Sequence, residues 1–231
     1  ESTGSAFRMH YVDAWTSITG NFDVNSYAVY APPRPNGTVQ PEGLSLVLHG
    51  SNVPYAAMAD AYFLVDQIRT TATTIDVATA SHSFTLSNVT HDSFYKVSFA
   101  PVVVTNRVPV WWLVAHGLTN ATGNAEALSD QDLDLLLTWM EYWAGTDPTN
   151  SASYFRMLDI EPLADDRFIL KWTATSNRVY ALTFDTNVED ATSSILASNI
   201  PGTVPANCVT VHVGSADAGV YRVKVELAPD P

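Results

Sequence analysis

Acidic residues in the segment SDQDLDLLLTWME, residues 129–141, follow the spacing of a calcium-binding loop. Asp130, Asp132 and Asp134 stand at positions 1, 3 and 5 of such a loop, where each supplies a carboxylate oxygen. Position 7, which contributes a backbone carbonyl, falls on Leu136, and position 12, a bidentate carboxylate, falls on Glu141. Because calcium prefers oxygen ligands in this number, the spacing predicts a calcium site made of these residues.

The same residues also fit a helix. Position 6 of the loop needs a sharp turn that glycine makes easily, but Leu135 stands there, and its side chain disfavours a positive φ. Ser129 suits a helix N-cap, and Asp130 and Asp132 would lie near the positive end of the helix dipole. One apolar face then leads to a closing glycine, through Leu133, Leu136, Leu137, Met140, Ala144 and Gly145. Of the two interpretations we expect the helix, without a cofactor, and keep calcium as the alternative.

Elsewhere the sequence contains no arrangement that is typical of catalysis. It has no G-x-S-x-G motif for a serine nucleophile, and its six histidines are scattered without the spacing of a zinc site. It also lacks a glycine-rich loop that would bind phosphate. We therefore expect a protein that is not an enzyme.

An excess of acidic residues limits the partners that the chain can bind. It has 24 Asp and Glu against 11 Lys and Arg, a net charge of −13 and a pI near 4.6. Since no basic patch can displace counterions from phosphates, we expect neither nucleic acid nor an anionic membrane surface as a partner. No apolar run approaches the ~20 residues of a membrane-spanning helix.

The composition also favours a secreted protein. Few charges with many Thr, Ser, Val and Asn residues are typical of secreted bacterial β proteins, and the single Cys208 cannot form an internal disulfide. The chain opens with Glu1 rather than Met, which predicts a mature form or a fragment whose export signal has been removed. We expect it outside the cell or on the surface of a bacterium.

Short runs of β-branched and aromatic residues predict a mainly β fold. Residues 26–103 and 151–231 contain such runs, separated by turns rich in Gly, Pro and Asn. Residues 104–150 change to a helical period, beginning with a short helix between Pro109 and Gly117. We therefore expect two small antiparallel β-sandwich-like modules joined by a helical joint.

Two stretches resemble families of secreted bacterial proteins. The first resembles the internalin-B-type surface repeat, through the motifs NGT, GS, VD, NVT and FA in order between residues 36 and 100. The second, WWLVAHGLTN followed by EYWAGTDPT, resembles a linker whose acidic part is similar to thrombospondin type 3 and dockerin calcium loops. The first resemblance implies a β module without chemistry of its own, and the second implies a C-terminal β module after the linker.

Most of the tryptophans lie in the predicted joint. Their aromatic rings would pack the helices together and against the flanking modules, although exposed rings could also bind glycans. The residues predicted to pack the joint are Trp111, Trp112, Leu133, Leu136, Leu137, Trp139, Met140 and Trp143.

Residues 1–25 precede the first module and alternate in a way that fits a β-strand. Phe7, Met9 and Tyr11 would form one face, with Trp15 following, and such a strand could pair with the sheet edge of a neighbouring copy. We therefore expect a non-catalytic extracellular structural protein, a surface, matrix or filament subunit that self-associates or binds another surface protein. The alternative is a carbohydrate-binding or accessory C-terminal region of a larger secreted polysaccharide-degrading enzyme.

Overall fold

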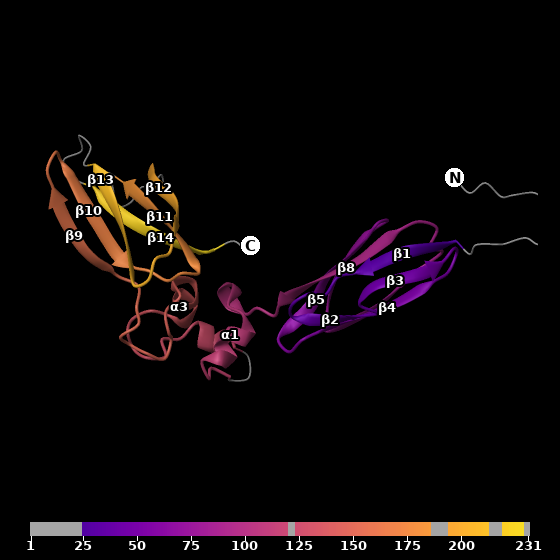
Figure 1. Cartoon of the computed structure of the whole chain (residues 1–231). Coiled ribbons are helices and arrows are strands. Elements are labelled where there is room, and N and C mark those ends of the chain that lie inside the picture. The colour runs from indigo at the N-terminus through magenta and orange to yellow at the C-terminus, as the bar shows by residue number, and fades with distance from the viewer. Residues whose placement is uncertain (1–24, 120–122, 186–193, 213–218, 229–231) are drawn as a thin grey trace, which may run out of the picture. The chain divides into compact units, whose positions relative to one another are not determined.

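The computed structural model describes residues 25–119, 123–185, 194–212 and 219–228. It confirms a mainly β chain with a few short helices (Figure 1). The chain divides into two compact units, one formed by residues 25–58 and 65–98, the other by residues 59–64 and the described residues from 99 onward. The predicted assembly strand with Phe7, Met9, Tyr11 and Trp15 lies outside the described residues.

The strands up to residue 101 form two sheets. A five-stranded sheet has the order β3-β1-β8-β5-β6, and a three-stranded sheet has the order β2-β4-β7. β1 pairs with β3 antiparallel but with β8 parallel, a parallel pair that the sequence prediction of antiparallel modules did not include. The strands are β1 (Ser26–Ala31), β2 (Gly37–Gln40), β3 (Gly43–Leu48), β4 (Val53–Ala59), β5 (Phe63–Thr70), β6 (Thr74–Thr79), β7 (Ser81–Leu86) and β8 (Ser93–Pro101).

Aromatic stacking joins these two sheets. Tyr55 of β4 lies in the small sheet and Tyr95 of β8 in the large one, and their ring centroids are 4.3 Å apart in a stacked arrangement. Both residues are buried, together with Val29 and Val97. Burial, with a further contribution from Tyr55, raises the pKa of Tyr95 to about 12. The inner faces therefore pack on each other as in a β-sandwich.

The second unit contains the joint and a second pair of sheets. The sheets have the orders β13-β10-β9 and β12-β11-β14. Trp172 of β10 and Tyr180 of β11 are fully buried between them, as are Leu170 and Leu182. The elements are η1 (Thr105–Arg107), α1 (Val110–Ala115), α2 (Asn124–Ala127), α3 (Thr138–Ala144), β9 (Met157–Leu163), β10 (Arg167–Thr173), β11 (Arg178–Asp185), β12 (Ser194–Pro201), β13 (Ala206–His212) and β14 (Val220–Leu227).

The helices follow the sequence prediction only in part. α1 begins after Pro109, which stands at the N-cap, and Gly117 follows its C-terminus with φ of 74°, as predicted. α3 begins only at Thr138, so the prediction of a continuous helix from Ser129 to Gly145 is wrong over its first half. None of the helices in the described part of the chain is long and apolar enough to cross a membrane.

A small apolar core holds the helices of the joint together. Trp112 and Leu113 of α1 are buried against Ala127 of α2 and Tyr142 of α3. The rings of Trp112 and Tyr142 meet edge to face at 5.3 Å, an arrangement that aromatic pairs favour. Trp111, also predicted to pack the joint, is instead 40% exposed.

Candidate calcium site

The backbone between Ser129 and Thr138 forms a loop in which two leucines adopt left-handed conformations. Leu133 has φ of 66° and Leu135 has φ of 81°. Their side chains point into solvent, with exposed fractions of 82% and 90%. The predicted apolar helix face that included Leu133 therefore does not form, and Leu133 does not pack the joint.

Asp130 holds the loop in this conformation. One carboxylate oxygen accepts the backbone N–H of Leu133 at 2.7 Å and that of Asp134 at 3.3 Å, and the other accepts the N–H of Leu135 at 2.9 Å. Each of these bonds involves a charged acceptor, and such bonds are stronger than bonds between neutral groups. Together they offset the cost of placing a leucine at positive φ, which is about 1–2 kcal/mol per residue.

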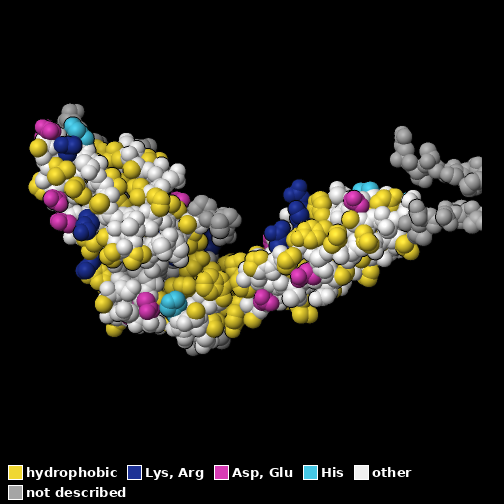
Figure 2. All heavy atoms as spheres, in the orientation of Figure 1, with side chains coloured by type: hydrophobic (Ala, Val, Ile, Leu, Met, Phe, Trp, Pro, Cys, Tyr) yellow, Lys and Arg dark blue, Asp and Glu magenta, His cyan; other side chains and the backbone are white. Residues whose placement is uncertain are grey.

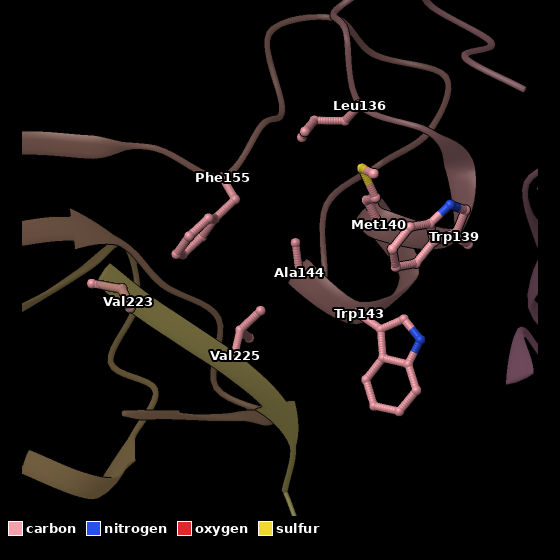
Figure 3. Close-up of a pocket in the computed structure, with 8 residues that line it drawn as sticks. All are labelled: Leu136, Trp139, Met140, Trp143, Ala144, Phe155, Val223 and Val225. Atoms are coloured by element: carbon pink, nitrogen blue, oxygen red, sulfur yellow. The ribbon is translucent and has the colours of Figure 1, made fainter. Parts of the chain in front are cut away.

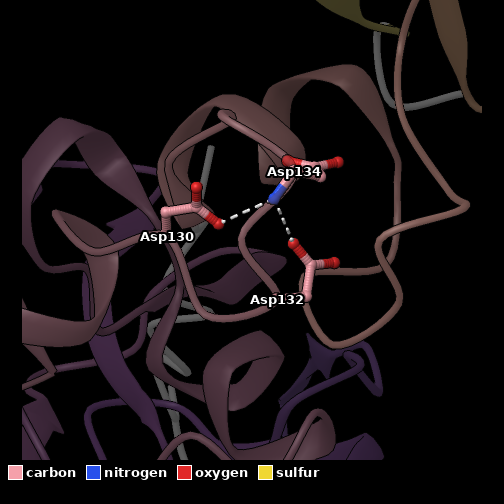
Figure 4. A group of neighbouring side chains, drawn as sticks. All are labelled: Asp130, Asp132 and Asp134. Carbon is pink, nitrogen blue, oxygen red and sulfur yellow. Dashed lines mark hydrogen bonds between the residues drawn. The ribbon is translucent and has the colours of Figure 1, made fainter.

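The loop brings three carboxylates together (Figure 4). One oxygen from each of Asp130, Asp132 and Asp134 lies within 4.8 Å of the other two. Asp132 also accepts the N–H of Asp134, and Asp134 accepts the N–H of Leu136 at 2.8 Å, and a second, buried oxygen of each has no hydrogen bond from any of the described residues. These two oxygens are acceptors without a donor, as expected of metal ligands.

Thr138 closes the base of the loop. Its backbone N–H and its hydroxyl both donate to the carbonyl oxygen of Ser129, each at 2.9 Å. Thr138 is fully buried and is the first residue of α3. The loop therefore enters the helix at a fixed point, and this fixes the position of Glu141 one turn further on.

Glu141 is the fourth carboxylate and the most buried. It is 0% exposed, one of its oxygens has only a long contact of 3.4 Å from the Thr146 hydroxyl, and the other has no hydrogen-bond partner within the described part of the chain. Burial, followed by repulsion from Asp132 and Asp134, raises the pKa of Glu141 to about 8. A buried carboxylate under repulsion from the acidic loop is the arrangement that a bound cation would stabilise.

These residues fit calcium. Calcium–oxygen distances are about 2.3–2.6 Å, so two oxygens on one ion lie no more than about 5 Å apart, as the three aspartates do. The carboxylate of Glu141 is not part of this group of three, although it lies near enough to Asp132 and Asp134 to be repelled by them. With Glu141 and the carbonyl of Leu136 added, the site would offer enough oxygen atoms for the six to eight ligands that calcium takes. The structure thus brings together the residues at positions 1, 3 and 5 of the predicted calcium loop, and the conformation is a loop rather than the helix that we expected.

The raised pKa of Glu141 gives the metal-free protein a defined pH dependence. The folded-state pKa, about 8, lies above the ordinary value of 4.5, so between these values the folded chain holds a proton that the unfolded chain has released. The free energy of unfolding should therefore fall as pH rises from about 4.5 to 8, by at most about 1.4 kcal/mol per unit from this group. Denaturant unfolding in chelator at pH 5.5 and 7.5 measures this difference. Substitution by glutamine should remove it, and equal slopes for both proteins would contradict the assignment.

Glycine at position 135 should stabilise the loop. Leu135→Gly removes the strain of a positive φ, and the flexibility of glycine in the unfolded chain returns part of that gain, which leaves a net increase of roughly 0.5–1 kcal/mol in the free energy of unfolding. Leu128→Gly is the matched control, since Leu128 is also exposed but has φ of −97° and should lose stability on substitution. Chemical denaturation of both variants measures the two effects. A loss at both positions would show that Leu135 is not strained.

The side of α3 that carries Met140 and Ala144 faces the C-terminal sandwich, which consists of the sheets β13-β10-β9 and β12-β11-β14. A cavity of about 430 Å³ lies between α3 and β14 (Figure 3), and four predicted joint residues line it: Leu136, Trp139, Met140 and Trp143. Phe155, Val223 and Val225 line the facing side. The helix that carries Glu141 thus turns Met140 and Ala144 toward the sandwich, so the candidate site and the sandwich share one helix.

Arg178 at the start of β11 connects α3 to the sandwich, a contact that was not predicted from the sequence. Its guanidinium group donates to the carbonyl oxygen of Trp143 at 2.7 Å and to that of Tyr142, both at the C-terminal end of α3. Those carbonyls have no partner within the helix, and a cation is favourable at that end of the helix dipole. No local sequence signal indicates this contact, because the partners lie 35 and 36 residues apart in the chain.

No protein-family model and no curated protein matches the sequence. The resemblances to the surface repeat and to the calcium-loop linker therefore remain predictions, and the site is interpreted from its own geometry.

Proposed function

We propose that the chain is a non-catalytic extracellular structural subunit whose joint binds one calcium ion. The ligands are carboxylate oxygens of Asp130, Asp132, Asp134 and Glu141 and the carbonyl of Leu136. The observation that carries this proposal is the convergence of the three aspartates in a loop that holds two leucines at positive φ. A buried carboxylate oxygen of Glu141, which has no hydrogen-bond partner among the described residues, supports the proposal independently.

The structural role follows from the position of the site. An ion shared by the loop and by Glu141 would fix the loop to the first turn of α3. The same helix is held at its other end by Arg178 of the sandwich. Calcium would therefore stabilise the joint on the C-terminal sandwich, as expected of a component that bears load and performs no reaction.

An extracellular location is consistent with this type of site. Extracellular calcium modules bind with dissociation constants of about 10⁻⁴–10⁻³ M, which suits a medium in which calcium is abundant. A loop with leucines in place of glycines adopts its conformation at a cost, so we expect an affinity in this weaker range. The surface, matrix or filament setting rests on the composition and the sequence resemblances.

Isothermal titration of the full chain with calcium chloride, after treatment with a chelator, tests the proposal. We expect one site per chain and a rise in melting temperature on calcium addition. Magnesium should bind more weakly, because it requires near-ideal octahedral geometry and dehydrates reluctantly. A calcium concentration of about 10 mM is ten times the largest dissociation constant expected. If neither heat of binding nor a rise in melting temperature were seen at this concentration, the proposal would be overturned.

A further inference from the structure

The outer strand β3 of the five-stranded sheet presents an apolar edge. β3 pairs with β1 on one side, and within the described residues no strand pairs with its other side. Leu44, Leu46 and Leu48 alternate along it with exposed fractions of 67%, 76% and 55%. Tyr30 of β1, opposite Leu44, extends the apolar surface across the sheet and is 47% exposed. Hydrophobic side chains are visible on the surface of this module in Figure 2.

The same three leucines carry the backbone groups that face the free edge. The N–H of His49 donates to the carbonyl of Asn25 at 2.9 Å, and that of Ala28, opposite Leu46, donates to Asp92 on the far side of β1. Hydrogen bonding alternates along an antiparallel pair, so Val47 and Ser45 bond to β1 as His49 does, and the leucines between them point their N–H and C=O groups outward. The exposed side chains and the unpaired backbone groups therefore belong to the same residues.

This edge lacks the features that protect other edges from association. β9 (Met157–Leu163) is also an outer strand with exposed apolar residues, but it contains Asp159, Glu161 and Pro162. Charged residues and proline on an edge strand prevent pairing with a second chain. β3, with the sequence GLSLVL, contains neither. An unprotected, apolar edge strand is a surface suited to pairing with another strand.

We propose that β3 pairs antiparallel with β3 of a second copy of this chain across a twofold axis at Leu46. The register follows because only the even-numbered residues of β3 point their backbone groups toward the free edge, so even-numbered residues must lie opposite one another. Only a pairing that sets Leu46 against Leu46 and Leu44 against Leu48 aligns all the outward backbone groups and gathers the six leucines on one face. A twofold contact of this kind uses the same surface on both copies.

Charge supports a second copy in this orientation. Each chain carries a net charge of −13, so copies repel over most of their surfaces, and an uncharged strand is where they can approach. Glu42 directly precedes β3, and Gly50 follows it two residues after its end. In the antiparallel pairing Glu42 of one copy lies opposite the uncharged Gly50 of the other, whereas a parallel pairing in register would place Glu42 against Glu42.

This inference rests on the proposed role as a structural subunit and names its partner, a second copy. It concerns the first β module, whereas calcium binding concerns the joint. The two can fail separately, since calcium binding is measured by titration and self-association by mass.

Sedimentation equilibrium of the full chain over a range of concentrations tests the pairing. We expect a monomer–dimer equilibrium, and Leu46→Lys should raise the dissociation constant at least tenfold because two lysines would face each other at the axis. Leu158→Lys on β9 is the matched control and should leave the equilibrium unchanged. A monomer at all concentrations, or equal effects of the two variants, would overturn the inference.

Opposite charges introduced at residue 46 test the register. Leu46→Lys mixed with Leu46→Glu should restore a dimer that contains one copy of each, because residue 46 meets itself across the axis. Met9→Lys addresses the competing occupant, the predicted assembly strand of a neighbouring chain. Loss of association in Met9→Lys, with no rescue in the Lys and Glu mixture, would show that this strand occupies the edge and would overturn pairing between β3 strands.

Discussion

Glu141→Gln is expected to abolish the stabilisation that calcium gives to the protein and to make the metal-free protein more stable. The two effects have opposite signs because they have different causes. Calcium needs the ionised carboxylate, and at 100 times its dissociation constant it would stabilise the folded chain by about 2.7 kcal/mol. Without calcium the same carboxylate is buried and repelled by Asp132 and Asp134, and neutral glutamine relieves this repulsion at pH above about 8.

Denaturant unfolding at pH 8.5, with calcium and with chelator, measures both effects in one experiment. Glu161→Gln is the matched control, since Glu161 is an exposed carboxylate on β9 and should leave both values near those of the original chain. Asp130→Asn should differ from Glu141→Gln. It removes the negative charge that accepts the N–H groups of Leu133 and Leu135, so it should lower the free energy of unfolding both with and without calcium. If Glu141→Gln kept the full calcium effect, this residue would not be a ligand.

Repetitive local patterns made most of the fold predictable. Runs of β-branched and aromatic residues identified most of the strands, though not β2, β4 or β12, and Pro109 and Gly117 marked the first helix, because these signals act on neighbouring residues. The parallel pairing of β1 with β8 could not be derived in this way. It joins segments more than 60 residues apart, and neither strand contains a feature that specifies its partner.

The candidate site shows why a local pattern can mislead. Leu133, Leu136, Leu137 and Met140 have helical spacing, and a leucine at positive φ is unfavourable, so propensity favoured the helix. The charged carboxylate of Asp130 reverses this preference, because it accepts three backbone N–H groups that in the interior of a helix would bond to carbonyl oxygens. The carboxylate spacing was therefore the better guide to the backbone conformation, because it described a loop of several residues rather than the preference of single residues.

Arg178→Met is expected to lower the free energy of unfolding by about 3 kcal/mol, and the loss should centre on the joint. Arg178 is 4% exposed, and burial lowers its pKa, so its cation is held in place mainly by carbonyl oxygens. Hydrogen bonds to charged groups contribute about 1.5–3 kcal/mol each, and methionine keeps much of the volume while removing the bonds to Tyr142 and Trp143. Gly145, which closes α3, has no room for a side chain beside Arg178 and Thr175, so the arginine is packed closely against the end of the helix.

Arg167→Met is the matched control, because Arg167 is half exposed and its ion pair with Asp165 lies in solvent at 3.6 Å. Exposed ion pairs contribute about 0–1 kcal/mol, so this variant should remain close to the original in stability. Calcium affinity gives a second measurement for Arg178→Met. If Arg178 positions α3, freeing the helix end should weaken calcium binding at Glu141 as well as stability. A stability loss with unchanged calcium affinity would mean that the ion and the arginine hold the helix independently, and that the joint is not one mechanical unit with the sandwich.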